Sequence, residues 1–233
     1  MSILQRFTAA LLALGSFSCC TEAPAEGGAE AGIGTASASE ASADATQPPE
    51  EPKYFDMFVD GPRDRFYQTG DAGFSFQDGV LTGTARNLPR NSFLATKKSY
   101  ADFEMEVEVK IAAGGNSGIQ IRSELDEAGD RIIGYQIEID TSKRAWSGGL
   151  FEEGKRGWLD DLKDNEAGRT AFKVGEWNLY RIRCQGDHIQ SWVNGVQCTD
   201  YHDDASAEGR IAFQVHGGKE ADVQWRNARI REL

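Results

Sequence analysis

NSGIQIR, residues 116–122, and GYQIEID, residues 134–140, are the two segments that decide the fold of this chain. In both segments apolar and polar residues alternate, which is typical of a strand with one face in a core. The polar positions hold hydrogen-bonding and charged groups in place of the Thr, Ser and Lys of an ordinary solvated face. They are Gln120, Arg122, Gln136, Glu138 and Asp140. If the two strands are neighbours, these side chains form one polar floor, which suits a sugar better than a lipid.

The rest of the folded part also reads as strands separated by turns. Residues 102–111 alternate apolar and charged side chains, which predicts a strand with one core face and one solvated face. Asn194-Gly195 is the strongest hairpin signal in the chain. Residues 143–168 have no clean period and are expected to form a long loop excursion. Further strands are expected over residues 80–85, 177–184, 188–193, 196–201, 209–216 and 222–232. No helix of normal length is predicted, and the pattern favours an all-β sandwich.

The first residues, 1–20, read as a secretion signal. Arg6 supplies a positive charge, residues 7–14 are apolar, and small residues precede Cys19. The apolar run is too short for a membrane span. A cysteine directly after a signal peptide predicts lipid attachment, so Cys19 is the candidate lipidation site, and plain secretion is the alternative. We therefore expect an exported protein of the bacterial cell envelope, held at the membrane only by an N-terminal lipid anchor.

Residues 21–52 are expected to form a disordered linker, because Ala, Gly, Ser, Glu and Pro dominate and large apolar residues are nearly absent. Residues 53–233 remain as a single folded domain, long enough for one sizeable core. The formal net charge of the chain is −12 at pH 7, and the −6 that remains on residues 53–233 argues against a nucleic-acid partner. Cys184 and Cys198 each lie in a predicted strand and are expected to stay unpaired, although export would permit a disulfide.

An ordered set of segments carries a family likeness that runs from Tyr54 to Leu233. The sequence has no Gly-rich phosphate loop, Cys-x-x-Cys pair, His-Glu-x-x-His motif or nucleophile elbow to point elsewhere. The segments are residues 116–122, 134–140, 149–153, 176–178, 192–195, 209–216 and 223–230. Through them the chain resembles the 3-keto-disaccharide hydrolase domain family, formerly called DUF1080. The resemblance implies a concanavalin A-like jelly-roll β-sandwich.

The resemblance also implies an activity, the cleavage of glycosides whose sugar is oxidised at C3. A 3-keto group acidifies the proton on C2, so a base can remove it, the aglycone leaves by elimination, and water then adds to the product. Such a site needs a base, an acid for the leaving group and donors that stabilise an enolate. The alternatives are a non-catalytic, lectin-like carbohydrate-binding domain and a surface lipoprotein that binds protein partners, because fold alone does not settle function.

The resemblance and the polar floor together nominate the site residues. The candidate catalytic groups are Glu138, His216 and Glu152, and the candidate substrate-binding groups are Gln120, Arg122, Gln136, Asp140, Arg156, Trp158 and Gln214. His216 has the same strand parity as Gln214, and the family carries a His at the matching place. The structural alternatives are an ion pair for Arg122 or Glu138, a turn role for Asp140 and local packing for Trp158.

A divalent metal is a further alternative for the same site. Glu138, Asp140 and His216 offer the oxygen and imidazole ligands that Ca, Mn or Zn take in different mixtures. The sequence has no metal-specific spacing, so the cofactor is left open at this point.

Overall fold

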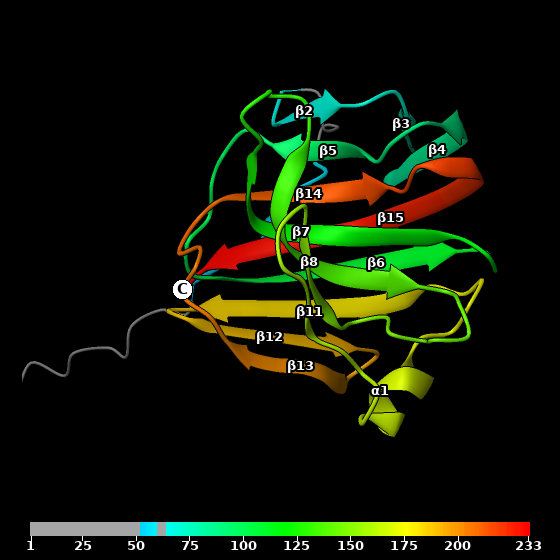
Figure 1. The fold of residues 1–233 in the computed structure, drawn as a ribbon. Helices are drawn as coiled ribbons and strands as arrows, with labels where there is room; N and C mark the ends of the chain where they lie inside the picture. The colour runs from blue at the N-terminus through cyan, green and yellow to red at the C-terminus, as the bar shows by residue number, and fades with distance from the viewer. Residues whose placement is uncertain (1–51, 60–63) are drawn as a thin grey trace, which may run out of the picture. The chain divides into compact units, whose positions relative to one another are not determined.

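Two stacked antiparallel sheets form the part of the chain that the computed structural model describes, residues 52–59 and 64–233 (Figure 1). The eight-stranded sheet runs in the order β13 (Val196–His202), β12 (His188–Val193), β11 (Asn178–Gln185), β6 (Phe103–Ile111), β15 (Gly218–Glu232), β4 (Val80–Leu88) and β3 (Gly73–Gln77), and β1 (Phe55–Asp56) also pairs with β15. The seven-stranded sheet runs in the order β10 (Gly157–Asp160), β9 (Leu150–Glu153), β8 (Ile132–Asp140), β7 (Asn116–Leu125), β14 (Arg210–Val215), β5 (Ser92–Thr96) and β2 (Phe66–Thr69). The predicted all-β jelly-roll sandwich is confirmed.

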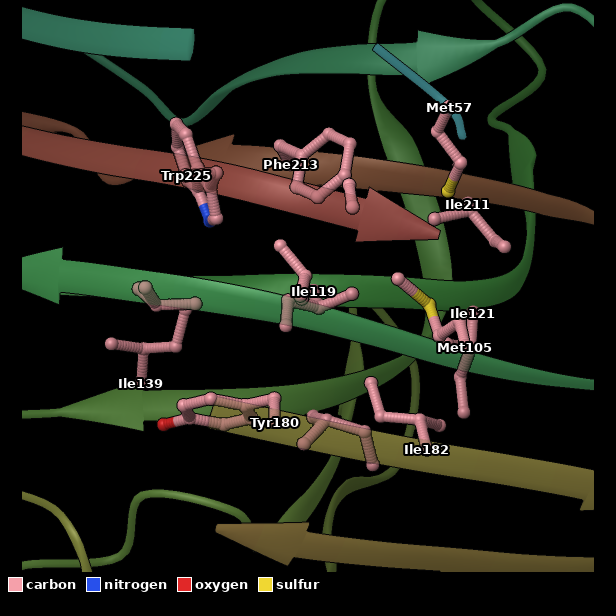
Figure 2. Packing of buried hydrophobic residues seen from close by; sticks show 14 of the residues in the cluster. Met57, Met105, Ile119, Ile121, Ile139, Tyr180, Ile182, Ile211, Phe213 and Trp225 are labelled. Carbon is pink, nitrogen blue, oxygen red and sulfur yellow. The ribbon is translucent and has the colours of Figure 1, made fainter. Parts of the chain in front are cut away.

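The core lies between the sheets and is built by the period-two alternation of their strands. Ile119 and Phe213 of the seven-stranded sheet face Met105, Tyr180 and Trp225 of the other sheet (Figure 2). All five side chains are fully buried. Because alternate residues point to opposite faces, the core positions of β7 and β8 send their polar neighbours to the outer face of the seven-stranded sheet.

A second apolar cluster lies on that outer face. It consists of Phe93, Ala95, Ala212 and Ile132, with Tyr67 and Leu125 packed against it. Leu125 and Ile132 are at the far end of the β7–β8 hairpin, which rises across the front of β14 and β5 (Figure 1). The hairpin therefore bends over the outer face of its own sheet.

Most predicted strands are present within a residue or two of their expected bounds, and Asn194-Gly195 forms the predicted hairpin turn between β12 and β13. Both turn residues have positive φ, 50° and 83°, as a type I′ turn requires. The prediction for residues 143–168 as a loop excursion was wrong in part. This segment contains β9, β10 and the start of the short helix α1 (Glu166–Ala171), whose lengths are too small to show a period.

Cys184 on β11 and Cys198 on β13 are free and buried. Burial raises the pKa of the Cys184 thiol to about 12 and that of Cys198 to about 11, so neither is a ready nucleophile. Among the described residues, no helix is long and apolar enough to cross a membrane. The signal-peptide prediction for residues 1–20, with Cys19, and nearly all of the linker prediction for 21–52 lie outside the described residues.

Candidate functional site

The predicted polar floor forms where β7 and β8 pair. Gln120 lies opposite Gln136, and Gly118 lies opposite Glu138, in an antiparallel register. Ile137 and Ile139 of β8 are buried in the core, so Gln136 and Glu138 point to the outer face. Gln214 of the next strand, β14, reaches the same group. Three strands thus deliver polar side chains to one place.

A chain of side-chain hydrogen bonds joins these residues. Gln120 Nε2 and Gln214 Nε2 each donate to Gln136 Oε1 at 2.8 Å. Gln136 Nε2 in turn donates to Glu138 Oε2 at 2.8 Å. Asn116 Nδ2 donates to the other carboxyl oxygen of Glu138 at 2.7 Å. Both oxygens of Glu138 therefore accept a hydrogen bond from an amide.

The floor is much more buried than an open sugar-binding surface. Gln120 and Gln214 have 0 % exposure, and Glu138 has 4 %. The bent β7–β8 hairpin packs over the same face, and Glu153 adds a contact from β9, with Oε2 3.4 Å from Gln214 Nε2. Buried polar groups are stable only when they are hydrogen-bonded, which this network achieves for most of its atoms.

Glu138 is the carboxyl group with the most unusual surroundings on this face. Burial raises its pKa above the ordinary value, and the nearby Asp140 adds to this, while the hydrogen bonds from Asn116 and Gln136 act in the opposite direction. Arg144 Nη2 lies 3.8 Å from Glu138 Oε1. A carboxyl with a raised pKa beside a guanidinium is suited to proton transfer next to developing negative charge.

Asp140 holds the loop that presents Arg144. Its carboxylate accepts hydrogen bonds from Arg144 Nε at 2.9 Å and from the backbone N–H groups of Ser142 and Trp146 at 2.9 and 3.3 Å. Burial pushes the pKa of Asp140 upward, but these hydrogen bonds outweigh it and hold the pKa below the ordinary value. Asp140 is therefore committed to the loop, and its predicted role in binding substrate is not supported by this geometry.

Three aromatic rings and Arg144 form a cluster next to Glu138. Trp158 contacts Phe151 and Trp146 edge to face, with ring centroids 5.2 and 4.8 Å apart. The guanidinium of Arg144 lies 4.8 Å from the Trp158 ring centroid. Trp158 also approaches Gly149, whose backbone pairs with that of Glu138. The three rings are half-buried, so this cluster offers an aromatic surface at the edge of the buried floor.

Arg122 was predicted to share the floor with Gln120, and this prediction was wrong. Its φ is 44°, and the β7–β8 register shifts between Ile121 and Glu124, so the alternation breaks at this point. The Arg122 side chain is buried on the other side. It donates to the carbonyls of Ala101 and Gly186 at 2.8 and 2.6 Å and to Asp102 at 3.0 Å.

Glu152 and Arg156 were also predicted for the site, and the structure places them elsewhere. Glu152 pairs with Tyr135 across the β8–β9 register, on the face opposite to that of Gln136, and it binds Arg156. Arg156 also donates to Asp203 at 2.7 Å, and Tyr135 Oη donates to Asp203. The hydrogen bond from Arg156 is the largest influence that holds the pKa of Asp203 far below its usual range.

His216 lies just after β14 and is exposed. Its Nδ1 is 2.6 Å from the Gly217 carbonyl, and since a carbonyl only accepts, Nδ1 is the donor of this hydrogen bond. Within residues 52–59 and 64–233, no group of three His, Cys, Asp or Glu side chains is arranged to hold a metal ion. Glu138, Asp140 and His216 therefore do not converge as a ligand set, because Asp140 is held by its loop and His216 by its own turn.

Two contributors, Arg144 and Asn116, were missed by sequence reasoning, and of the neighbours Glu152 and Glu153 the wrong one was nominated. Arg144 lies in the segment expected to be an aperiodic excursion, and Asn116 was seen only as the start of a strand. Glu153 reaches Gln214, whereas its neighbour Glu152 does not face the floor. The spacing Asp140-x-x-x-Arg144 at the end of a strand was the one available signal, because a carboxylate there often closes a turn.

The architecture belongs to the concanavalin A-like jelly-roll class of β-sandwich. Within that class, residues 39–231 match the family described as the 3-keto-alpha-glucoside-1,2-lyase-like domain, and the chain belongs to this family. A search of curated proteins returned no match.

Several solved structures share the fold at low sequence identity. A presumed glycosyl hydrolase from Parabacteroides distasonis ATCC 8503 is 23 % identical with a TM-score of 0.55, covering 78 % of this chain and 100 % of that one. The carbohydrate-binding module CBM66 from Bacillus subtilis is 16 % identical with a TM-score of 0.55, covering 72 % and 98 %. A lichenase from a mouse hindgut metagenome is 13 % identical with a TM-score of 0.53, covering 77 % and 99 %. At these identities the likeness establishes the fold alone.

Proposed function

We propose that this protein cleaves glycosides whose sugar carries a keto group at C3. Membership of the 3-keto-alpha-glucoside-1,2-lyase-like family supports this substrate class. The observation that carries the proposal is Glu138, a buried carboxyl with a raised pKa that lies 3.8 Å from the guanidinium of Arg144. Elimination next to a ketone needs these two components, a base and a positive charge near the enolate oxygen.

The proposed reaction has two steps. In the first, a base takes the proton from C2, the electron pair of that C–H bond forms a C1–C2 double bond, and the C1–O bond to the aglycone breaks. The leaving oxygen takes up a proton and departs as an alcohol. In the second step water adds across the double bond, with hydroxyl on C1 and hydrogen on C2, giving the free 3-keto sugar.

We assign the roles of Glu138, Arg144 and Trp158 from the positions of their side chains. Glu138 exchanges the proton on C2, and Arg144 binds the ketone oxygen and stabilises the enolate. The half-buried ring of Trp158 provides a stacking surface for the sugar. His216, exposed just after β14, is the candidate acid for the leaving oxygen, and this role rests on the family likeness.

A direct assay tests the reaction. The purified protein is incubated with a 3-keto-disaccharide and with the matching unoxidised disaccharide, and release of both sugars is followed by NMR in D₂O. Release from the keto substrate alone, with deuterium incorporated at C2, is the expected result. Equal release from the two substrates, or no release by a folded protein, would contradict the proposal.

A second candidate function is non-catalytic binding of carbohydrate. The cluster of Trp146, Phe151 and Trp158 beside Arg144 favours it, because half-buried aromatic rings are a common surface for sugar stacking. Calorimetric titration with unmodified glycans distinguishes the two functions. Binding without turnover of any 3-keto substrate would support this second candidate.

We also propose that the protein is exported and lipid-anchored through Cys19. The signal-like residues 1–20 support this proposal. Mass spectrometry of the mature N-terminus, with Cys19→Ser as the comparison, tests it. A mature protein that keeps residues 1–18 would contradict it.

A further inference from the structure

The three glutamines behind Glu138 form a network in which every amide points the same way. Gln120 and Gln214 both present an NH₂ group to Gln136 Oε1, and Gln136 presents its own NH₂ group to Glu138. Ser123 Oγ lies 2.7 Å from Gln120 Oε1 and completes the chain at its far end. Each hydrogen bond is therefore donated in the direction of Glu138 Oε2, starting from Gln214 on β14 and from Ser123 on β7.

The direction of the network matches an ionised Glu138, because each amide presents its NH₂ group toward the carboxylate end of the chain. If the Gln136 amide were reversed, its NH₂ group would face the NH₂ groups of Gln120 and Gln214, and three donors would meet without an acceptor. Its oxygen would then face Glu138 Oε2, which is tolerable only when the carboxyl is protonated. The arrangement of two donors on Gln136 Oε1 therefore favours the ionised form of Glu138, which can only accept.

Gln214 has one unsatisfied polar atom in this arrangement. Its Oε1 is buried and has no hydrogen-bond partner among the described residues. Its Nε2 serves two oxygens, Gln136 Oε1 at 2.8 Å and Glu153 Oε2 at 3.4 Å. The amide thus leaves an acceptor unsatisfied, which is unfavourable, while its NH₂ group is directed at Gln136 Oε1.

We propose that Gln120, Gln136 and Gln214 are positioning residues, which we call the amide lock. Their hydrogen bonds hold Glu138 in its proton-accepting form. Glu138 is then the base of the reaction and not the acid. The role of Glu138 as a base rests on the proposed function, whereas the effect of the amides on its proton affinity does not. Each carboxylate oxygen keeps lone pairs that Asn116 and Gln136 do not use, so Glu138 can still take a proton from substrate. The lock therefore prepares the carboxylate without blocking it.

Other polar and charged groups around Glu138 are compatible with this role. Arg144 lies on the solvent side at 3.8 Å and favours the carboxylate, and Asp140 on the same strand opposes it. From the other sheet, Tyr180 Oη donates to the backbone carbonyl of Glu138 at 3.3 Å and does not touch the carboxyl group. The Gln136 amide is thus the group that donates to Glu138 Oε2 from the buried side.

The test measures the proton affinity of Glu138 without substrate. In the full-length protein, ¹³C NMR of the glutamate carboxyls is followed against pH, and the Glu138 signal is identified by its loss in Glu138→Gln. In Gln136→Met we expect the proton affinity to rise about tenfold or more, since a hydrogen bond to the charged form is lost. Gln214→Met is the decisive variant, because this side chain contacts Gln136 and not Glu138. It should shift the same titration in the same direction by a smaller factor.

Gln224→Met is the matched control, a half-buried strand glutamine in the other sheet whose Nε2 lies 3.5 Å from Thr82 Oγ1. It should leave the Glu138 titration unchanged.

A titration that stays unchanged in both Gln136→Met and Gln214→Met overturns the lock, even if the melting temperature falls, because that combination marks a purely structural network. If the titrations shift as expected but the wild-type protein releases no sugar from 3-keto substrates, the lock stands and the proposed reaction fails. With activity present, the acidic limb of kcat/KM should move to higher pH in the same two variants.

Discussion

At the scale of the residue, Glu138 takes its chemistry from its neighbours. Burial disfavours its charge, while Asn116 and Gln136 donate to its two oxygens and Arg144 approaches from the exposed side. These opposing influences leave a buried carboxyl whose pKa is raised above the ordinary value. Glu152 has the same functional group and is equally buried, but it is paired with Arg156 on the other face.

Glu138→Gln should therefore abolish proton abstraction and leave the fold intact. We expect the rate of sugar release to fall about 100-fold or more, the usual contribution of a general base. Steady-state kinetics with a 3-keto-disaccharide, together with a melting curve, measure both effects. Glu152→Gln is the matched control, and it should lower the melting temperature while sugar release per folded molecule stays near wild type. The reverse pattern in the two variants would move the site to the Glu152–Arg156 cluster.

The raised pKa of Glu138 also predicts how stability depends on pH. Between the ordinary value of 4.5 and the raised value, the folded protein binds more protons than the unfolded chain, so the free energy of unfolding falls as pH rises. The side chain in Glu138→Gln cannot ionise, so the free energy of unfolding of this variant does not fall for this reason as pH rises. Relative to wild type, the variant should therefore gain stability as pH goes from about 4 to about 7, as measured by urea unfolding at both values. A relative loss over that range would show that ionisation of Glu138 stabilises the fold.

At the scale of the element, a register shift in the β7–β8 hairpin separates a part that supplies the polar floor from a part that covers it. Up to Ile121 its polar residues build the floor, and beyond Ile121 the register shifts and the hairpin bends over the outer face. The positive φ of Arg122 makes this bend, since it reverses the side to which the following residues point. The hairpin both supplies and covers the buried polar network.

Ile132→Ala should weaken this cover. Ile132 is fully buried against Phe93, Ala95 and Ala212, so truncation should lower the free energy of unfolding by about 2–4 kcal/mol. Ile133→Ala, at the next position and only half-buried, is the matched control and should cost clearly less. Urea unfolding measures the difference, and equal costs would mean that the hairpin end does not pack as described.

At the scale of the whole molecule, the two sheets have different outer faces. On the eight-stranded sheet, Arg226, Arg229 and Arg231 of β15 pair with Glu108, Glu106 and Glu104 of β6. The Arg226 and Arg229 pairs are partly exposed and contribute little individually. The seven-stranded sheet carries the buried network and the aromatic cluster, so the candidate site belongs to one face of the sandwich.

Arg122 joins the sheets at one end of the sandwich. From β7 it donates to Ala101, just before β6, and to Gly186, in the turn after β11. Arg122→Met would remove the side-chain donor of these carbonyls and leave Asp102 with the Gly186 N–H, and we expect a loss of about 3 kcal/mol in the free energy of unfolding. Arg226→Met, which removes a partly exposed pair, should cost no more than about 1 kcal/mol. Sugar release per folded molecule should be unchanged in both, and a loss of activity in Arg122→Met at full stability would return Arg122 to the site.

Much of the fold could be predicted from single segments. Strict alternation over residues 102–111 and the Asn194-Gly195 turn are local signals, and both gave the correct structure. Residues 143–168 could not be predicted in this way, because β9 and β10 are four residues each and the loop before them is fixed by Asp140. Arg144 became visible as a neighbour of Glu138 only through that loop.

The sequence by itself determined the two-sheet sandwich and the gathering of Gln120, Gln136 and Glu138 on one face, because period-two alternation is a property of each strand alone. Only the tertiary structure decided which charged residues join them. Arg122 left the floor at a register shift, Glu152 pointed to the opposite face, and Arg144 arrived from a loop. Such outcomes depend on backbone φ, on cross-strand register and on burial by distant segments, and none of these is contained in the local pattern of residues.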